Sequence, residues 1–147
     1  MQKSLFPILL VDDDPLVAEV LDRAAKTNFP EASFIHITSF EDAKLYIDNL
    51  EGKGPKLVLL DIDLKDKVDG LDFLALLRAH PKGRLLPVVM LSARKTAKLV
   101  ERAYIFGASS FTIKPFSYAD WKTYLSNLRT YWFETVTLLE VRHEKES

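Results

Sequence analysis

Short apolar runs alternate with amphipathic stretches five times along the sequence. Four runs are mainly apolar, as in strands buried on both faces of a sheet, and they cover residues 6–11, 57–61, 87–92 and 110–113. A fifth run, at 34–37, alternates as an edge strand does. Elsewhere apolar residues recur at helical spacing, at about 15–28, 39–50, 71–77, 95–106 and 118–132. The alternation predicts an α/β domain with a parallel sheet.

Four of the predicted strands end on side chains that can carry chemistry: Asp12 and Asp13, Asp61, Ser92, and Lys114. The carboxyl ends of parallel strands lie along one edge of a sheet, and ligands bind there where the strand order reverses. With the first strand central, the order is 2-1-3-4-5, that of a doubly wound, flavodoxin-like (βα)5 sandwich with five parallel strands. We therefore expect the three aspartates beside the reversal point.

The types of residue at this edge indicate phosphoryl chemistry. Three carboxylates in one crevice repel one another unless a hard cation lies among them, and Mg²⁺ accepts carboxylate, water and phosphate oxygens together. Asp61 can act as a nucleophile, since carboxylates form acyl phosphates. Lys114 could offset charge on a phosphoryl group, and Ser92 could donate a hydrogen bond to it. Each residue alone has a simpler explanation as a solvated turn, a cap or a surface lysine, but their joint placement favours a site.

Composition limits the classes of protein. The 147 residues carry a net charge of −1 and no basic run, which gives no reason to expect a nucleic-acid surface. The absence of cysteine excludes disulfides and thiolate metal sites, and it fits a reducing compartment. The sequence contains neither a signal peptide nor a stretch long enough to span a bilayer. We expect a soluble, cytoplasmic protein with no membrane partner.

Five motifs occur in a characteristic order: Val11-Asp12-Asp13, Asp61 followed by Asp69-Gly70, Leu91-Ser92-Ala93, Gly107 to Phe111, and Lys114-Pro115-Phe116. Over residues 5–130 the chain resembles the receiver domain of two-component response regulators, of the chemotaxis-regulator type. We expect a receiver domain over residues 1–133 and a C-terminal tail over 134–147. The resemblance implies a signalling phosphoacceptor that catalyses its own phosphorylation and dephosphorylation, and not an enzyme acting on other substrates.

By that resemblance, Asp61 would accept phosphate from the phosphohistidine of a sensor histidine kinase or a phosphotransfer protein. Asp13, Asp61 and the backbone carbonyl of Asp63 would ligate Mg²⁺, while Asp12 would orient a metal-bound water. The remaining expected roles fall to residues of the fourth and fifth strands. Ser92 and Lys114 would hold phosphoryl oxygens, Ser92 and Phe111 would form the switch, and the peptide between Lys114 and Pro115 would be cis.

The sequence departs from the family pattern between Asp61 and Gly70. The family usually has Met-Pro a few residues after the phosphoacceptor, whereas this chain reads Leu-Lys-Asp-Lys-Val at 64–68 and is one residue longer. The extra residue falls after Asp63, so we expect the metal site to survive. Asp63 and Arg94 occupy positions that in this family influence how long the phosphoryl group lasts, either by pairing across the site mouth or by steering water.

The C-terminal region is rich in aromatic and aliphatic residues. Residues 131–138 resemble the end of single-domain regulators that partner bacterial phytochrome-type histidine kinases, and these can dimerise through this region. The chain shows no DNA-binding domain, so we expect the signal to pass to an unknown downstream protein or through a homodimer. The alternative is that the tail folds back on its own domain.

Two other functions remain open at this point. The run Leu59 to Asp63 resembles the nucleophile motif of haloacid-dehalogenase-type phosphatases, but that family has its second acidic pair late in the chain, whereas Asp12 and Asp13 come about fifty residues earlier. A receiver-like protein-binding module that is never phosphorylated is the second alternative. The complete set of site residues argues against it.

Overall fold

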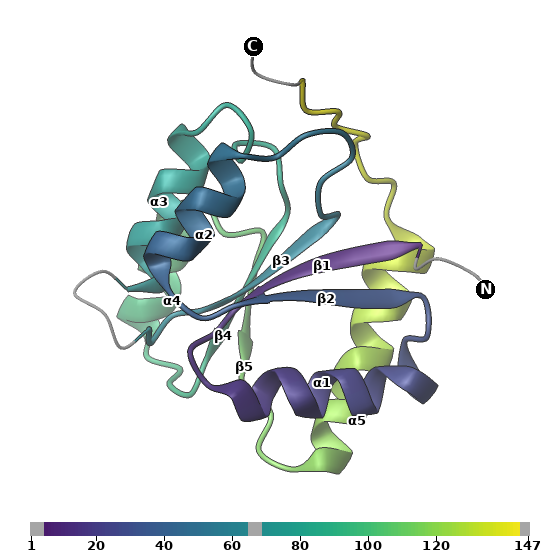
Figure 1. Ribbon diagram of the computed structural model, residues 1–147. Coiled ribbons are helices and arrows are strands. Elements are labelled where there is room, and N and C mark those ends of the chain that lie inside the picture. The colour runs from purple at the N-terminus through teal and green to yellow at the C-terminus, as the bar shows by residue number, and fades with distance from the viewer. Residues whose placement is uncertain (1–4, 65–68, 145–147) are drawn as a thin grey trace.

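The computed structural model describes residues 5–64 and 69–144. Its centre is a sheet of five parallel strands in the order β2-β1-β3-β4-β5 (Figure 1), which confirms the predicted order. The strands are β1 (Phe6–Val11), β2 (Ala32–Ile37), β3 (Leu57–Asp61), β4 (Val88–Ser92) and β5 (Ser110–Ile113). The order reverses at β1, so the carboxyl ends of β1 and β3 lie at the reversal point.

Helices cover both faces of the sheet. They are α1 (Pro15–Asn28), α2 (Phe40–Asp48), α3 (Gly70–Ala79), α4 (Ala97–Ile105) and α5 (Tyr118–Leu128), with α5 continuing as a π-helical segment, η1 (Arg129–Thr135). Helices α1 and α5 pack on one face, and α2, α3 and α4 lie on the other (Figure 1). The result is the doubly wound three-layer sandwich that the sequence predicts.

Alternating side chains of the central strands supply both halves of the core. On β1, Leu9 and Val11 join the cluster under α2 to α4, whereas Ile8 and Leu10 join the cluster under α1 and α5. All four side chains are fully buried. A strand covered on both faces needs apolar residues at every position, which explains the continuous apolar run in the sequence. Strand β2 is half-buried throughout, as expected of an edge.

Side-chain caps set the starts of the helices. The Asp14 carboxylate accepts the Leu16 N–H (3.0 Å), and Pro15 is the first residue of α1, as predicted. Helix α4 starts two residues later than the periodicity indicates. The reason is Thr96, whose hydroxyl accepts the Leu99 N–H (3.2 Å) and so caps the helix.

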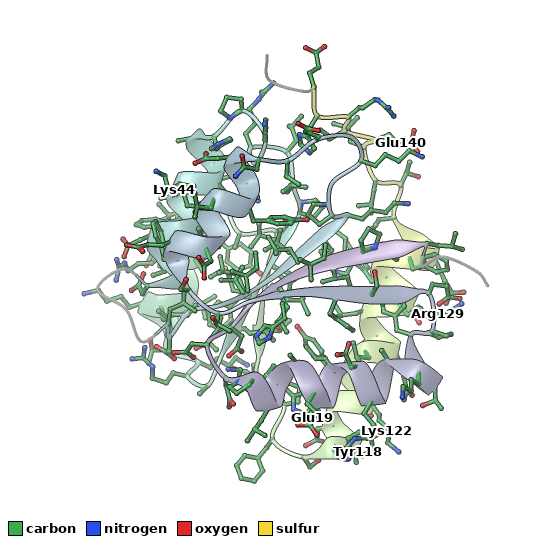
Figure 2. All side chains as sticks on the ribbon, viewed as in Figure 1. Glu19, Lys44, Tyr118, Lys122, Arg129 and Glu140 are labelled. Atoms are coloured by element: carbon green, nitrogen blue, oxygen red, sulfur yellow. The ribbon has the colours of Figure 1, made fainter. Side chains whose placement is uncertain are left out.

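The C-terminal tail folds back on its own domain, which is one of the two alternatives left open by the sequence. Just before the tail, Arg129 makes two hydrogen bonds to Glu31 in the α1–β2 connection, at 2.7 and 2.8 Å, and Figure 2 shows Arg129 beside that connection. Further on, His143 and Gly52 exchange backbone hydrogen bonds as an isolated antiparallel bridge. The division at residue 133 stays a prediction, since η1 runs across it.

Two further points concern the limits of the described chain. The unusual loop at 65–68 lies outside the described residues. Within residues 5–64 and 69–144, no helix combines the length and apolar character that crossing a bilayer requires.

Candidate functional site

The carboxyl edge of the sheet gathers three aspartates. Asp12 and Asp13 follow β1, and Asp61 is the last residue of β3. One carboxylate oxygen from each lies within 4.8 Å of those of the other two. Asp12 is fully buried and Asp61 is 3% exposed. The parallel pairing of β1 with β3 brings these side chains together, as predicted, and the three form what we call the acidic site.

Lys114 reaches the acidic site from the end of β5. Its Nζ lies 2.9 Å from Asp12 Oδ2 and 3.4 Å from Asp61 Oδ2. Its backbone N–H donates to the Ser92 carbonyl (2.8 Å), which fixes the lysine to the end of β4. The lysine therefore bridges the two buried carboxylates.

The peptide between Lys114 and Pro115 is trans, because the described residues contain no cis peptide bond. The expectation of a cis bond is wrong for this structure. A trans bond is the intrinsically favoured form before proline. The long lysine side chain still reaches both carboxylates from it.

Burial and charge shift the ionisation of the site. Burial first, and then the neighbouring Asp12 carboxylate, raise the pKa of Asp61 to about 6, although Lys114 and the Asp63 N–H act in the opposite direction. For Lys114, burial alone would lower the pKa, but Asp12 and Asp61 outweigh it and raise the pKa above its ordinary value. Lys114 therefore stays charged, while the acidic site holds more negative charge than one lysine can offset.

The donor set fits a hard divalent cation. Asp12 Oδ2 is buried, and its close contact within the described part of the chain is the ion pair with Lys114 Nζ at 2.9 Å. The same lysine also faces Asp61, so one positive charge is shared by a group of three carboxylates, and a further cation would lower their repulsion. Three carboxylates with oxygens this close together offer the ligand type that Mg²⁺ prefers.

Ser92 and Asp63 lie next to the acidic site, and Arg94 connects them. The Ser92 hydroxyl donates to the Arg94 carbonyl (2.8 Å) and accepts the Arg94 N–H (3.0 Å), so in this state it is engaged with its own loop. The Asp63 N–H donates to Asp61 Oδ1 (3.2 Å). The guanidinium of Arg94 pairs with the Asp63 carboxylate at 2.9 Å. Of the two options left open by the sequence, the structure has the ion pair.

Phe111 lies on β5, three residues before Lys114. Its ring is half-buried against the core cluster under α2 to α4. Its backbone N–H donates to the hydroxyl of Tyr104 on α4 (3.2 Å). The Phe111 ring therefore lies at the border between the core and the surface formed by α4 and β5.

His36 also lies beside the site, although no motif in the sequence points to it. Its Nε2 lies 2.8 Å from the backbone carbonyl oxygen of Asp12. The available signal was a single ionisable residue among the otherwise apolar residues 34–37 of β2. Which group it meets depends on the pairing register of β1 and β2, which aligns His36 with Leu10.

Comparisons with known proteins agree on one family. The sequence model of the response regulator receiver domain matches residues 8–126. The chain is 35% identical over 134 residues to the probable methanogenesis regulatory protein FilR2 of Methanothrix harundinacea. The matched region covers 86% of this chain and 83% of FilR2. The chain spans less than half the length of several transcriptional regulators that it also matches.

Two solved structures are closely similar in fold. Response regulator RPA3017, described as acting in red light signaling of R. palustris, superposes with a TM-score of 0.83 at 25% identity and covers 93% of this chain and 100% of its own. The Mn²⁺-bound form of response regulator Rcp1, a Synechocystis protein, superposes with a TM-score of 0.79 at 25% identity over 91% and 99% of the two chains.

Proposed function

This chain belongs to the response regulator receiver family of two-component signalling, and from that premise we propose that Asp61 is its phosphoacceptor. The carrying observation is the position of Asp61. It ends a buried strand at the reversal point of the sheet, with Lys114 Nζ 3.4 Å from its carboxylate and two more carboxylates beside it. The donor would be the phosphohistidine of a sensor histidine kinase or of a phosphotransfer protein.

We assign Mg²⁺ to the acidic site, with Asp12, Asp13, Asp61 and the backbone carbonyl of Asp63 as the protein groups around it. The Mn²⁺-bound form of Rcp1 supports a divalent cation in a similar protein. A bound Mg²⁺ would supply positive charge that offsets the charge of the phosphoryl group. Asp12 is the residue we assign to orienting a bound water, because its buried carboxylate lies beside those of Asp13 and Asp61.

In the transfer, an oxygen of the ionised Asp61 carboxylate forms the new P–O bond while the P–N bond of phosphohistidine breaks. The imidazole nitrogen keeps the electron pair of that bond. Lys114 stays protonated and binds a phosphoryl oxygen, which lowers the charge repulsion between phosphate and carboxylate. Because the pKa of Asp61 is about 6 in the metal-free protein, most of it is ionised at neutral pH.

The switch would begin at Ser92. Its hydroxyl bonds the Arg94 backbone in this structure, and we propose that it turns to donate to a phosphoryl oxygen once Asp61 is phosphorylated. Phe111 would then move from its half-buried position further into the core. The exchange of one hydrogen bond at the end of β4 would thus change the surface formed by α4 and β5.

The proposed context is a cytoplasmic receiver that is partnered by a phytochrome-type histidine kinase and passes its signal to an unknown downstream protein. The red-light role in the description of RPA3017 supports that class of kinase. A homodimer through the C-terminal region is part of this proposal, because Tyr131 and Leu139 keep 53% and 68% of their surface exposed. Light scattering tests it, and a monomer at high concentration would count against it.

The test of phosphorylation is the intact mass of the protein after incubation with Mg²⁺ and acetyl phosphate. We expect one phosphoryl adduct on the wild type, none after chelation, and none on Asp61→Asn. Absence of both an adduct and Mg²⁺ binding would instead favour a binding module that is never phosphorylated. Steady turnover of a simple phosphomonoester would favour the phosphatase alternative, which the family assignment does not support.

A further inference from the structure

We propose that His36, on the edge strand β2, is a positioning residue for the acidic site. It would hold the peptide that joins Asp12 to Asp13, and so it would set the affinity of the site for Mg²⁺. The inference rests on the proposed function in that it assigns Mg²⁺ to this site. His36 lies on a strand next to the site and is not itself a ligand of Mg²⁺ in this proposal.

Both the N–H and the carbonyl of Asp12 make contacts with β2. Its N–H donates to the Ile37 carbonyl (3.1 Å), which continues the ladder between the two strands. Its carbonyl oxygen lies 2.8 Å from His36 Nε2. Because a carbonyl oxygen only accepts, Nε2 carries the hydrogen in this contact. The imidazole therefore replaces a backbone donor at the point where the described ladder ends at Val11 and Ile37.

The group that His36 holds lies at the centre of the site. The Asp12 carbonyl belongs to the peptide plane that also contains the Asp13 nitrogen, so fixing it limits rotation of both residues. The Asp12 carboxylate in turn accepts the Asp14 N–H (2.8 Å) and contacts Lys114. One hydrogen bond from β2 thus acts on two of the three carboxylates.

Electrostatic repulsion between the carboxylates explains why this hydrogen bond would affect Mg²⁺ binding. The three carboxylates repel one another, and this repulsion contributes to the raised pKa of Asp61. In the metal-free protein the loop after β1 would relieve the repulsion by moving away from Asp61. A hydrogen bond to the buried Asp12 peptide opposes that movement, so the ligands are already close together when the cation binds.

The test compares three variants of one residue. His36→Leu removes the donor, His36→Gln retains a donor at similar reach, and His36→Asn retains an amide with shorter reach. Calorimetry gives Mg²⁺ affinity, and urea unfolding gives stability. We expect His36→Leu and His36→Asn to weaken Mg²⁺ binding about tenfold, the size of effect of one lost hydrogen bond, and His36→Gln to stay within about threefold of wild type.

A second measurement needs no metal. In the metal-free protein, hydrogen exchange of the Asp14 amide reports on whether the loop holds its position, since that amide bonds the Asp12 carboxylate. We expect faster exchange in His36→Leu and wild-type exchange in His36→Gln. His80→Leu is the matched control, because it removes a histidine bond to Asp48 (2.8 Å) that is not part of the acidic site. It should lower stability and leave both readouts unchanged.

The outcomes separate the inference from the proposed function. If the wild type binds Mg²⁺ and His36→Leu binds it equally well with unchanged Asp14 exchange, the inference is wrong and the proposed function stands. If the wild type binds no Mg²⁺, the assignment of the cation fails, and the affinity claim for His36 fails with it. If His36→Leu does not fold, His36→Asn against His36→Gln decides the matter by the same two measurements.

Discussion

Gly70 lies so close to the backbone of Asp61 that a Cβ at position 70 would overlap the Asp61 carbonyl oxygen. The same Cβ would lie 2.8 Å from the Cα of Ile62. The Gly70 N–H donates to the Ile62 carbonyl (2.9 Å), so the start of α3 is fixed against the end of β3. A glycine at position 70 is therefore a steric requirement where α3 meets the end of β3, and the obstacle is backbone that cannot rotate away.

Replacing Gly70 by alanine should disturb Asp61 directly. We expect Gly70→Ala to lower the free energy of unfolding by about 1–3 kcal/mol, as overpacking does, and to slow phosphorylation from acetyl phosphate at least tenfold. Urea unfolding and intact mass measure the two effects. Gly52→Ala is the control, because its Cβ meets nothing within 4 Å and only its φ of 70° is unfavourable. It should lose some stability and phosphorylate normally, and equal phosphorylation of both variants would contradict the steric argument.

The buried charge of Asp61 should make the metal-free protein less stable at neutral pH. Its pKa rises from 3.8 in the unfolded chain to about 6 in the fold, so between these values the folded state binds more protons. Stability is therefore favoured at low pH and lost as pH rises through 6. The difference amounts to at most about 3 kcal/mol. We expect Asp61→Asn to be more stable than wild type at pH 7.5 in chelator and to lose that advantage at pH 4.5.

Two comparisons test this reading of Asp61. The exposed Asp22→Asn on α1 should change stability little at either pH. Saturating Mg²⁺ should stabilise the wild type more than Asp61→Asn, because the cation binds the folded carboxylate. A stability advantage of Asp61→Asn that is the same at pH 4.5 and 7.5 would show that something other than ionisation is responsible.

The parts of the molecule that the sequence predicts are those with local or repeating signals. Continuous apolar runs appear because β1, β3 and β4 are buried on both faces, and caps such as Ser39 act within a few residues. The acidic site is predictable for a topological reason. Once the strands are parallel, Asp12 and Asp61 must end at the same edge, whatever the details of the helices.

The missed features depend on contacts between distant parts of the chain. The tail is held by the bridge of His143 to Gly52, and the segment before the tail is held by Arg129 at Glu31; neither pairing has a local signature. The partner of His36 follows from strand register, which periodicity does not fix. The change from α-helix to π-helix begins at Arg129, the residue whose guanidinium bonds Glu31, 98 residues away in the sequence.

The Arg94–Asp63 ion pair should control the lifetime of the phosphoryl group and not the stability of the fold. Both side chains are about half exposed or more, and exposed pairs contribute little to stability. We expect Arg94→Ala to unfold within about 0.5 kcal/mol of wild type. It should lose its phosphoryl group several times faster, because removing the guanidinium gives water easier access beside Asp61. The decay of the adduct mass after removal of the donor measures the rate.

A double-mutant cycle separates the pair from its members. If the ion pair is the active unit, Asp63→Ala and Arg94→Ala should each speed decay, and the double variant should be no faster than the faster single. Additive effects would mean that each side chain acts on water independently. An unchanged lifetime of the phosphoryl group in Arg94→Ala would show that Arg94 does not control dephosphorylation.

His143 should make closure of the C-terminal tail sensitive to pH. Its side chain is 6% exposed, and burial first, then the charges of Lys82 and His80, lower its pKa below the ordinary 6.5. The closed tail therefore binds fewer protons than an open one, in which the histidine regains its ordinary pKa. As pH falls below 6.5, protonation favours the open form, so closure is most stable at neutral and higher pH.

Amide hydrogen exchange can measure this opening, because Gly52 and His143 donate the two hydrogen bonds of the bridge. We expect protection factors at both amides to fall severalfold between pH 7.5 and 5.5, after correction for the intrinsic rate of exchange. His143→Leu places an apolar side chain at the buried position and removes the titrating group. Protection of the two bridge amides should therefore no longer depend on pH in this range. Because His80 is one of the groups that lower the pKa of His143, His80→Gln is the second control and should keep most of the pH dependence. The same fall in His143→Leu as in wild type would assign the effect to another group.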